Sequence, residues 1–426
     1  MSFTPNFDLI EELKWRGLHH QHIPGVKEAL TKEQITGYVG FDPTADSLHI
    51  GNLVPIILLV HLQRAGHKPI ALVGGATGMV GDPSGKKAER TLLDLDTLNH
   101  NLACQKKQLE QFLDFSGENA AEMANNYDWF KDLNFLEFIR DIGKHITVNY
   151  MLAKDSVKNR IDDGISFTEF SYQLVQGYDF YYLNEHKNCK LQMGGSDQWG
   201  NIVTGTELIR RKGGKEAYAI TAPLLTKPDG SKFGKSEGGN IWLDKYKTTP
   251  YQFYQFWIKT PDAEAEKLIK IFTLLDHETI DGIIAAHQGN EHLRGLQKTL
   301  AQHVTTWVHG ADELQKAEYL SGILFSDDVM GNLRKLEEAD FLDVFSGAKQ
   351  GSVDAIDGQN IVDVLAECGL AASKGEAKRA LKENSISVNR EKVKEDFSFS
   401  SKDLIKNRFI LLQRGKKNYF LLSINS

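Results

Sequence analysis

The chain is poor in cysteine and has no long hydrophobic run. Its three cysteines, Cys104, Cys189 and Cys368, are widely spaced among 426 residues, which argues against a disulfide framework and against a zinc site. No stretch of about 18 apolar residues is present to cross a membrane. The N-terminal residues lack the basic patch and apolar core of a signal peptide. We therefore expect a cytoplasmic protein without a membrane partner.

Charge is distributed unevenly along the chain. The net charge is −7, yet residues 351–426 hold 13 Lys and Arg against 10 Asp and Glu, a balance of +3 that leaves −10 for the rest. A basic tail on an acidic body indicates contact with a polyanion. On charge alone, a solvated surface of mixed sign explains the tail equally well.

The first half of the chain alternates as an α/β protein does. Short apolar runs at 37–41 and 69–73 predict buried strands, each followed by turn residues, and the apolar segment 48–62 predicts a buried helix. This order predicts a parallel sheet, whose ligands lie beyond the carboxyl ends of its strands. Further strands are expected at 190–193 and 218–225, and further helices at 97–115, 135–149 and 166–182.

The second half predicts a different architecture. Residues 250–345 have mostly helical spacing, 346–352 are small and polar, and 361–381 predict two helices followed by short strand-like pieces. We therefore expect an α/β segment, a helical segment, a linker and a small C-terminal α+β segment, with limits at 1–245, 246–345, 346–357 and 358–426.

The tetrapeptide His49-Ile50-Gly51-Asn52 stands where a strand and turn give way to a helix. Backbone N–H groups at a helix N-terminus stabilise phosphate, and Gly51 lets a flat base approach the backbone. His49 can donate a hydrogen bond to phosphate as charge builds up in a reaction. Taken alone, the motif is short, and a helix cap with a surface histidine is the simpler interpretation.

A second motif, Lys232-Phe233-Gly234-Lys235-Ser236, lies among glycines far downstream. Two lysines three residues apart on a flexible loop suit the β- and γ-phosphates of a nucleotide. The motif does not fit the Walker A pattern. By itself, a solvated hairpin loop is again the simpler interpretation.

Together and in this order, the two motifs resemble the HIGH and KMSKS sequences of class I aminoacyl-tRNA synthetases, and the residues around them are similar to the tyrosyl-tRNA synthetases of bacteria. The similarity runs over nearly the whole chain and includes the segments 38–49, 81–86, 171–179 and 194–201. It implies ATP-dependent ligation of tyrosine to its tRNA in translation. It also implies a Rossmann-like catalytic domain that includes the loop 232–236, an α-helical anticodon-side domain and a C-terminal RNA-binding module of the S-four type.

The resemblance implies a tyrosine site. Tyr38 and Asp179 would hydrogen-bond the phenol, so that phenylalanine would leave both without a partner. The residues that would hold the α-ammonium and the carboxylate are Tyr172, Gln176, Asp82 and Gln198. Outside this context, positions 172, 176 and 179 form one helix face, which is more often a solvated stripe.

The resemblance also implies an ATP site in which alignment and charge stabilisation carry catalysis. The expected catalytic residues are Thr44, His49, Asn52, Lys86, Arg90, Lys232 and Lys235. The expected nucleotide contacts are Gly40, Asp42, His49, Gly51, Gly195, Asp197, Lys232, Lys235 and Ser236. We expect Mg²⁺ to arrive with ATP and no dedicated metal site, because no carboxylate cage is visible in the sequence.

Two places depart from the family pattern. Asn52 replaces the second histidine of the first motif; it keeps a neutral donor but cannot become a cation, so we expect function to be retained. Phe233 and Gly234 replace the methionine and serine of the second motif, whereas both lysines are kept.

The resemblance further implies tRNA and a second copy of this chain as partners. The expected RNA contacts are Lys374, Lys378, Arg379, Lys382, Arg414, Lys416 and Lys417. The expected homodimer interface is the insertion at 130–172, which is rich in aromatic and aliphatic residues. Two alternatives stay open: an adenylyltransferase that does not use tRNA, and a non-catalytic RNA-binding relative.

Overall fold

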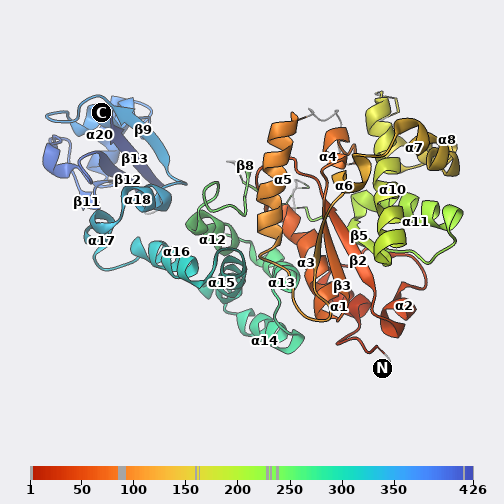
Figure 1. Ribbon diagram of the computed structural model, residues 1–426. Coiled ribbons are helices and arrows are strands. Elements are labelled where there is room, and N and C mark those ends of the chain that lie inside the picture. Colours follow the sequence, from red (N-terminus) through yellow and green to blue (C-terminus); the bar gives the residue numbers. More distant parts are fainter. Residues whose placement is uncertain are drawn as a thin grey trace. The chain divides into compact units, whose positions relative to one another are not determined.

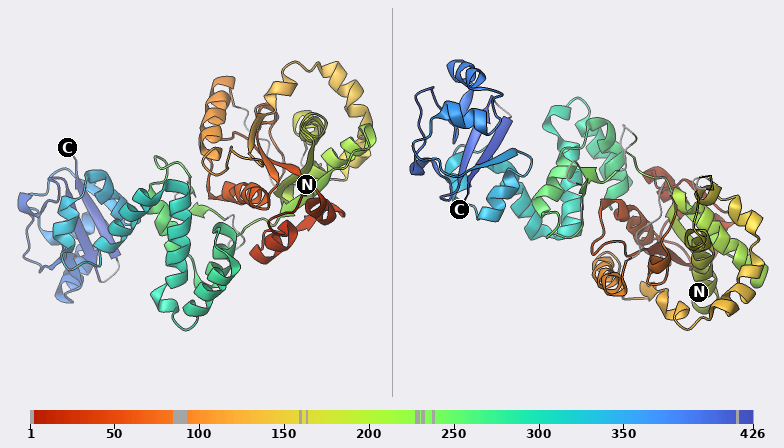
Figure 2. Two further views of the ribbon diagram at one scale, coloured as in Figure 1. Left: turned by 60° about the horizontal axis from the view of Figure 1, so that its bottom comes forward. Right: turned by 90° about the horizontal axis from the view of Figure 1, so that it is seen from above.

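The computed structural model describes residues 3–84, 93–158, 161–162, 164–226, 230, 233–236, 239–415 and 418–425, with the backbone alone at 235–236. The chain forms two compact units. The first is Met1–Thr248 with Trp257–His309, and the second is Thr249–Phe256 with Gly310–Ser426. Figures 1 and 2 trace the chain through each unit. No helix in the described part combines the length and apolar character needed to span a membrane.

The first unit is built on a sheet with the strand order β1-β6-β5-β2-β3-β4. The strands from β2 to β6 run parallel, and β1 pairs with β6 in the antiparallel sense. A separate hairpin pairs β7 with β8. The strands are β1 (Gln21–His22), β2 (Thr36–Phe41), β3 (Lys68–Val73), β4 (Glu122–Asn125), β5 (Cys189–Gly195), β6 (Tyr218–Ala222), β7 (Lys235–Ser236) and β8 (Gly239–Asn240).

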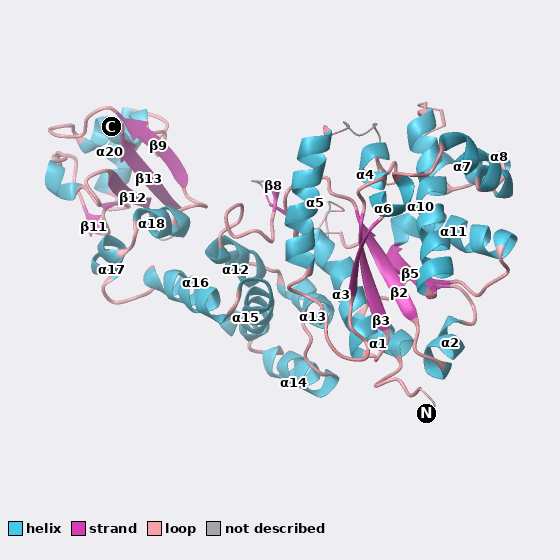
Figure 3. Ribbon diagram, in the orientation of Figure 1, coloured by secondary structure: helices cyan, strands magenta, loops and turns pink. Residues whose placement is uncertain are grey.

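The helices of the whole first unit are α1 (Leu9–Arg16), α2 (Val26–Lys32), α3 (Ile50–Arg64), α4 (Thr77–Val80), α5 (Leu95–Leu109), α6 (Tyr127–Phe130), α7 (Phe135–Asp141), α8 (Val148–Leu152), α9 (Asp155–Lys158), α10 (Phe167–Lys187), α11 (Trp199–Lys212), α13 (Asp262–Phe272), α14 (His277–His287) and α15 (Gly295–His309). Helices such as α3, α5, α10 and α11 lie close to the sheet, as Figure 3 shows. Single 3-10 turns lie at Gly143–His145, Ser196–Gln198 and Glu291–Leu293.

The two faces of β2 explain why α3 and α10 lie on opposite sides of the sheet. Tyr38 packs against Phe180 of α10, with ring centroids 5.5 Å apart. Its neighbour Gly37 faces the other way, where a Cβ atom would lie 2.9 Å from Leu62 of α3. Because successive strand residues point to opposite faces, α10 covers the face that carries Tyr38.

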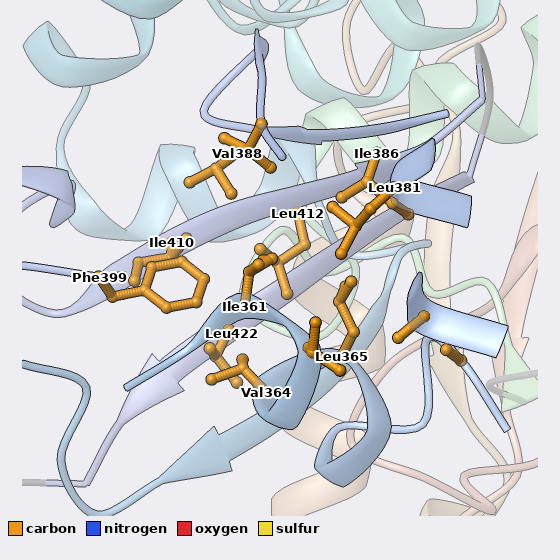
Figure 4. Packing of buried hydrophobic residues seen from close by; sticks show 14 of the residues in the cluster. Ile361, Val364, Leu365, Leu381, Ile386, Val388, Phe399, Ile410, Leu412 and Leu422 are labelled. Carbon is orange, nitrogen blue, oxygen red and sulfur yellow. The ribbon is translucent and has the colours of Figure 1, made fainter. Parts of the chain in front are cut away.

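The second unit is a sheet with helices on both faces. Its strand order is β11-β10-β12-β13-β9. Ile410, Leu412 and Leu422 pack with α19 and α20 (Figure 4), whereas Leu411 and Leu421 pack with α16 to α18. The elements are α12 (Pro250–Ile258), which crosses the boundary between the units, α16 (Ala311–Ile323), α17 (Val329–Lys335), α18 (Glu338–Val344), β9 (Lys349–Val353), α19 (Ile361–Glu367), α20 (Lys374–Lys382), β10 (Ile386–Val388), β11 (Glu391–Lys392), a 3-10 turn (Ser401–Asp403), β12 (Phe409–Arg414) and β13 (Asn418–Ile424).

Two expectations need correction. The single helix expected at 135–149 is broken into α7, a 3-10 turn and α8, because Thr147 caps a new helix by accepting from the Tyr150 N–H. The segment 346–357, expected as a linker, contains β9, which pairs in parallel with β13. Its small polar residues therefore form a sheet edge rather than a free connection. The domain limits stay predictions, since the compact units group 257–309 with the first sheet.

Candidate active site

Three neighbouring parallel strands, β2, β3 and β5, end at the same edge of the sheet (Figure 1). Asp42 follows β2 directly, and Thr77 opens α4 shortly after β3. The Thr77 hydroxyl donates to Asp42 Oδ1 at 2.7 Å, so the two loops are joined. Ligands of parallel sheets lie at this edge, and most of the predicted site residues are found here.

Tyr38 and Asp179 are buried on the same face of the sheet, one in β2 and the other in α10; each is 1% exposed. The Tyr38 hydroxyl has no hydrogen-bond partner within the described part of the chain. Burial, reinforced by the Asp179 charge, raises the pKa of Tyr38 well above its ordinary value. A buried hydroxyl without a partner costs about 1–3 kcal/mol, so this atom fits a polar group of a ligand.

Two donors hold the Asp179 carboxyl. Trp129 Nε1 donates to Oδ1 at 2.9 Å and Asn126 Nδ2 donates to Oδ2 at 3.1 Å. Burial raises the pKa of Asp179 to about 8, against the lowering effect of the two hydrogen bonds. Asn126 is itself fixed, because its Oδ1 accepts from the Ala76 N–H at 2.6 Å. Asn126 and Trp129 were not predicted from the sequence, since the strand before them, Glu-Met-Ala-Asn, has no apolar run.

Tyr172 lies among three carboxylates. Its hydroxyl donates to Asp42 Oδ2 at 2.8 Å. Burial and the charges of Asp42, Asp82 and Asp179 raise the pKa of Tyr172 well above its ordinary value. Because nearby negative charges stabilise a cation, an ammonium group fits this place. Asp42, a predicted nucleotide contact, is engaged with Tyr172 and Thr77 in this arrangement.

Asp82 and Gln198 come together from distant parts of the sequence. Gln198 Nε2 donates to Asp82 Oδ2 at 2.7 Å. Asn201, which the sequence analysis did not single out, donates to Gln198 Oε1 at 3.2 Å and to Asp82 Oδ1 at 3.4 Å. These hydrogen bonds hold two predicted substrate-binding side chains in one cluster.

Three glutamines of α10 and β5 have buried amide oxygens that can still accept a hydrogen bond. The Oε1 atoms of Gln173, Gln176 and Gln192 have no hydrogen-bond partner among the residues described. Buried acceptors are normally satisfied by protein or water, so each of these oxygens can accept a hydrogen bond from a ligand or a water molecule. Gln176 was predicted for this role from the resemblance; Gln173 and Gln192 were not.

The first motif caps α3. His49 is the N-cap residue, and its ring Nδ1 accepts from the Gly51 N–H at 3.0 Å. Asn52 Oδ1 accepts from the His49 N–H at 3.0 Å, which completes a capping box. The Asn52 side chain therefore fixes the backbone that presents His49.

The second motif lies against the first. A Cβ atom on Gly234 would be 3.4 Å from the Gly51 nitrogen, and the φ angle of Gly234 is +84°. Ile241 links the two segments, since its N–H donates to the Gly234 carbonyl at 3.0 Å and its own carbonyl accepts from the Ile50 N–H at 2.9 Å. The fold thus brings two motifs some 180 residues apart to one helix N-terminus.

The other predicted nucleotide contacts lie at strand ends. Gly40 and Thr44 are exposed, and a Cβ atom on Gly40 would meet nothing within 4 Å. A Cβ atom on Gly195 would lie 2.7 Å from Asp197 Oδ1, so glycine is needed for that carboxylate to fold back over the end of β5. Lys86, Arg90 and Lys232 lie outside the described residues, as do the side chains of Lys235 and Ser236.

Within the described ranges, no group of three or more His, Cys, Asp and Glu side chains is placed to hold a metal ion.

In the second unit, four of the predicted RNA contacts lie on α20, where Lys374, Lys378, Arg379 and Lys382 are exposed. Arg414 forms an ion pair with Glu376, in which its Nη1 lies 2.8 Å from Oε1 of the carboxylate. Lys416 and Lys417 lie outside the described residues.

Comparison with known proteins gives the family. The family described as "tRNA synthetases class I (W and Y)" matches residues 30–326. This chain belongs to it. A second family, described as "Tyrosine--tRNA ligase SYY-like C-terminal domain", matches residues 340–422. The predicted α/β fold of a class I synthetase with a separate C-terminal module is confirmed.

Relatives of this class I synthetase match it over its whole length. A tyrosine–tRNA ligase of Flavobacterium johnsoniae is 60% identical, covering 98% of this chain and 99% of the relative. A tyrosine–tRNA ligase of Bacteroides fragilis is 56% identical, covering 97% of this chain and 99% of the relative. Among solved structures, a C-terminally truncated mitochondrial tyrosyl-tRNA synthetase of Aspergillus nidulans has a TM-score of 0.68 and 30% identity, and covers 75% of this chain and 94% of that one.

The buried carboxyl of Asp179 makes the stability of this synthetase depend on pH. Its pKa of about 8 in the folded chain exceeds the value near 4 of an unfolded aspartate. The free energy of unfolding should therefore fall as the pH rises from about 4 through about 8. Asp179→Asn stays neutral and should flatten this slope, whatever its own cost in lost hydrogen bonds.

Urea unfolding of the ligand-free protein between about pH 5 and pH 8 measures the slope. The matched control is Asp96→Asn, at an exposed aspartate in the first turn of α5, which should keep the slope of the parent. An Asp179→Asn protein with the full slope would contradict the assignment.

Proposed function

We infer that the chain is a tyrosine–tRNA ligase. It activates L-tyrosine with ATP to give tyrosyl-adenylate and pyrophosphate, and then transfers tyrosine to the 3′ end of its tRNA in translation. The observation that carries this inference is full-length identity of 55–60% to bacterial tyrosine–tRNA ligases. The buried polar cluster at the sheet edge supports it independently of sequence identity.

We propose that Tyr38 and Asp179 bind the substrate phenol. The phenol would donate to the Asp179 carboxylate and accept from the Tyr38 hydroxyl, which otherwise lacks a partner in the described part of the chain. Asn126 and Trp129 would hold the carboxylate in place. Phenylalanine would bury the same groups without pairing them, and this cost is the source of specificity.

The charged end of tyrosine would lie beside Tyr172. The α-ammonium suits Asp82, Gln176 and the Tyr172 hydroxyl, because a carboxylate and neutral acceptors favour a cation. The arrangement of three carboxylates around Tyr172 supports this choice. Gln198, which now donates to Asp82, would turn its amide to orient the substrate carboxylate.

The nucleotide would lie across the N-terminus of α3, with its adenosine beside the backbone of Gly40, Gly51 and Gly195; of these, Gly40 has open space at its Cβ position. Asp197 would accept from the ribose hydroxyls, and Asp42 would contact the nucleotide from the end of β2. The groups proposed to contact the triphosphate are Thr44, His49, Lys86, Arg90, Lys232, Lys235 and Ser236. Asn52 would act through the cap, holding His49 rather than touching phosphate.

Two displacements follow from this placement. A tyrosine carboxylate oxygen attacks the α-phosphorus, the bond to the bridging oxygen breaks, and pyrophosphate leaves with the electron pair. A hydroxyl of the terminal adenosine of tRNA then attacks the tyrosyl carbonyl, and AMP leaves. Alignment and cationic groups around the pyrophosphate supply most of the acceleration. We propose that Mg²⁺ enters with the triphosphate, and that the protein acts in the cytoplasm.

The first test is exchange of labelled pyrophosphate into ATP. Exchange should require tyrosine, and Tyr38→Phe should weaken tyrosine selectivity over phenylalanine by about 1–3 kcal/mol, or roughly 5- to 150-fold. Tyr319→Phe, at a tyrosine that is 53% exposed and lies in α16, is the matched control. Exchange driven by another amino acid indicates a different adenylyltransferase, and no exchange indicates a non-catalytic relative; either result would overturn the assignment.

We propose that α20 binds tRNA phosphates. Lys374, Lys378 and Lys382 follow one another at helical spacing and are exposed, whereas Ala377 and Leu381 of the same helix are buried. Replacing the three lysines with glutamine should weaken tRNA binding and lower its salt dependence by about 0.7–0.9 per lost contact. Exchange should be unaffected, because α20 lies outside the catalytic unit. Unchanged tRNA binding at several salt concentrations would remove α20 from the interface.

We propose that the chain is a homodimer through the insertion at 130–172, which carries α7, α8, α9 and the start of α10. Large apolar side chains are exposed there, which is uncommon on a monomer when they are contiguous; they are Phe135, Leu136, Ile139, Val148, Ile161 and Phe167. Leu136→Glu should give monomers in sedimentation equilibrium, since a buried unpaired charge opposes association. The control Leu293→Glu, at another exposed leucine that lies outside the insertion, should stay dimeric. A monomeric parent would end the proposal.

A further inference from the structure

The loop that carries the two lysines is seated by an aromatic side chain. Phe233, the residue after Lys232, stacks on Phe272 with ring centroids 5.5 Å apart and an interplanar angle of 18°. It also lies 6.0 Å from the ring of Trp257, which in turn is 4.9 Å from Phe272. Trp257 and Phe272 are at most 1% exposed. They form a rigid seat for the one large apolar side chain of the motif.

Phe272 is the last residue of α13, and Arg16 holds the helix at that point. Arg16 is 2% exposed and is the last residue of α1. Its Nη1 donates to the carbonyls of Lys270 and Thr273 at 2.9 and 2.8 Å, and its Nη2 donates to the Leu275 carbonyl at 2.7 Å. A guanidinium thus satisfies carbonyls that the end of a helix leaves open, and its charge suits the helix dipole.

Further contacts fix Arg16 itself. Its Nε donates to Glu12 Oε1 at 2.6 Å, and the second oxygen of Glu12 lies 2.7 Å from His277 Nε2. The His277 ring stacks on Trp15, with centroids 3.7 Å apart. The last turn of α1 is therefore hydrogen-bonded to the end of α13, and it is joined to the start of α14 by the contacts of Glu12 and Trp15 with His277.

We propose that Arg16 is a positioning residue for the lysine loop. By holding the carbonyls on both sides of Phe272, Arg16 fixes the aromatic seat on which Phe233 rests, and Phe233 anchors the described part of the loop next to Gly234. Gly234, beside Gly51 of α3, provides the second fixed point of the loop. The inference rests on the proposed function, because it concerns the step in which pyrophosphate leaves.

A purely structural role for Arg16 makes a different prediction. If the guanidinium only stabilised the fold, its replacement would reduce the amount of active protein and leave the properties of each active site unchanged. A positioning role should instead slow adenylate formation in every active site and leave tyrosine affinity alone. Small misplacements of catalytic groups can cost orders of magnitude in rate.

The test uses Arg16→Lys, Phe233→Leu and the double variant in the full-length protein. Lysine keeps the charge but has three donors for four acceptors, and leucine keeps apolar bulk but cannot stack. Rates of adenylate formation are measured in single turnovers at several ATP concentrations and normalised to active sites by titration. Tyrosine dissociation constants are measured in parallel. Leu30→Ala is the control, because it opens a cavity in α2, which packs beside α1, without touching the carbonyls held by Arg16.

Each single variant should lower the normalised rate by about tenfold or more with an unchanged tyrosine dissociation constant. The double variant should be no slower than the slower single one, since both changes act through the same seat. Leu30→Ala should keep the parent rate per active site. A normal rate in Arg16→Lys, or effects that multiply in the double variant, would overturn the proposal. Failure of the proposed function is distinct, because the parent protein itself would then form no adenylate.

Discussion

The parallel pairing of β2 between β3 and β5 is the constraint on which both halves of the site depend. It places Tyr38 inside the sheet, Asp42 at its edge and the cap of α3 a few residues later, all from one strand and its following turn. The neighbours then supply Thr77 and Asp82 from one side and Gly195 to Gln198 from the other. A shift of β2 by one residue would turn Tyr38 toward α3 and Gly37 toward α10, and the proposed tyrosine site would be lost.

This arrangement stores an electrostatic cost that a substrate can relieve. The charges of Asp42, Asp82 and Asp179 add to burial in raising the pKa of the Tyr172 hydroxyl. Burial also raises the pKa of Asp179 to about 8. Donors from Trp129, Asn126, Thr77 and Gln198 offset part of the cost in the ligand-free chain. Under the proposed function, a substrate with an ammonium group and a phenol would bring a cation and a further hydrogen-bond donor to these buried carboxyl groups, and part of the binding energy would come from that pairing.

Sequence reasoning could predict what lies along one element and less of what meets across elements. The strand that carries Tyr38, the helix that carries Tyr172 and Asp179, and the cap at His49 all follow from local spacing. Asn126, Trp129 and Asn201 could not be predicted, because they hydrogen-bond to side chains that are distant in the sequence. Such contacts leave no periodic pattern in the sequence. The strand β9 was not predicted for a similar reason. Its residues are mostly small and polar, and they form a strand because they pair with β13.

The structure also explains why the motifs tolerate their unusual residues. At position 52 the side chain accepts from the His49 N–H, a task that needs a neutral acceptor and no positive charge, so asparagine serves it fully. At position 234 the left-handed backbone favours glycine, and at position 233 a flat ring matches the ring of Phe272 better than a flexible thioether. The substituted residues thus shape and seat the backbone. The chemistry is proposed for His49 and the two lysines, residues that this chain shares with the family pattern.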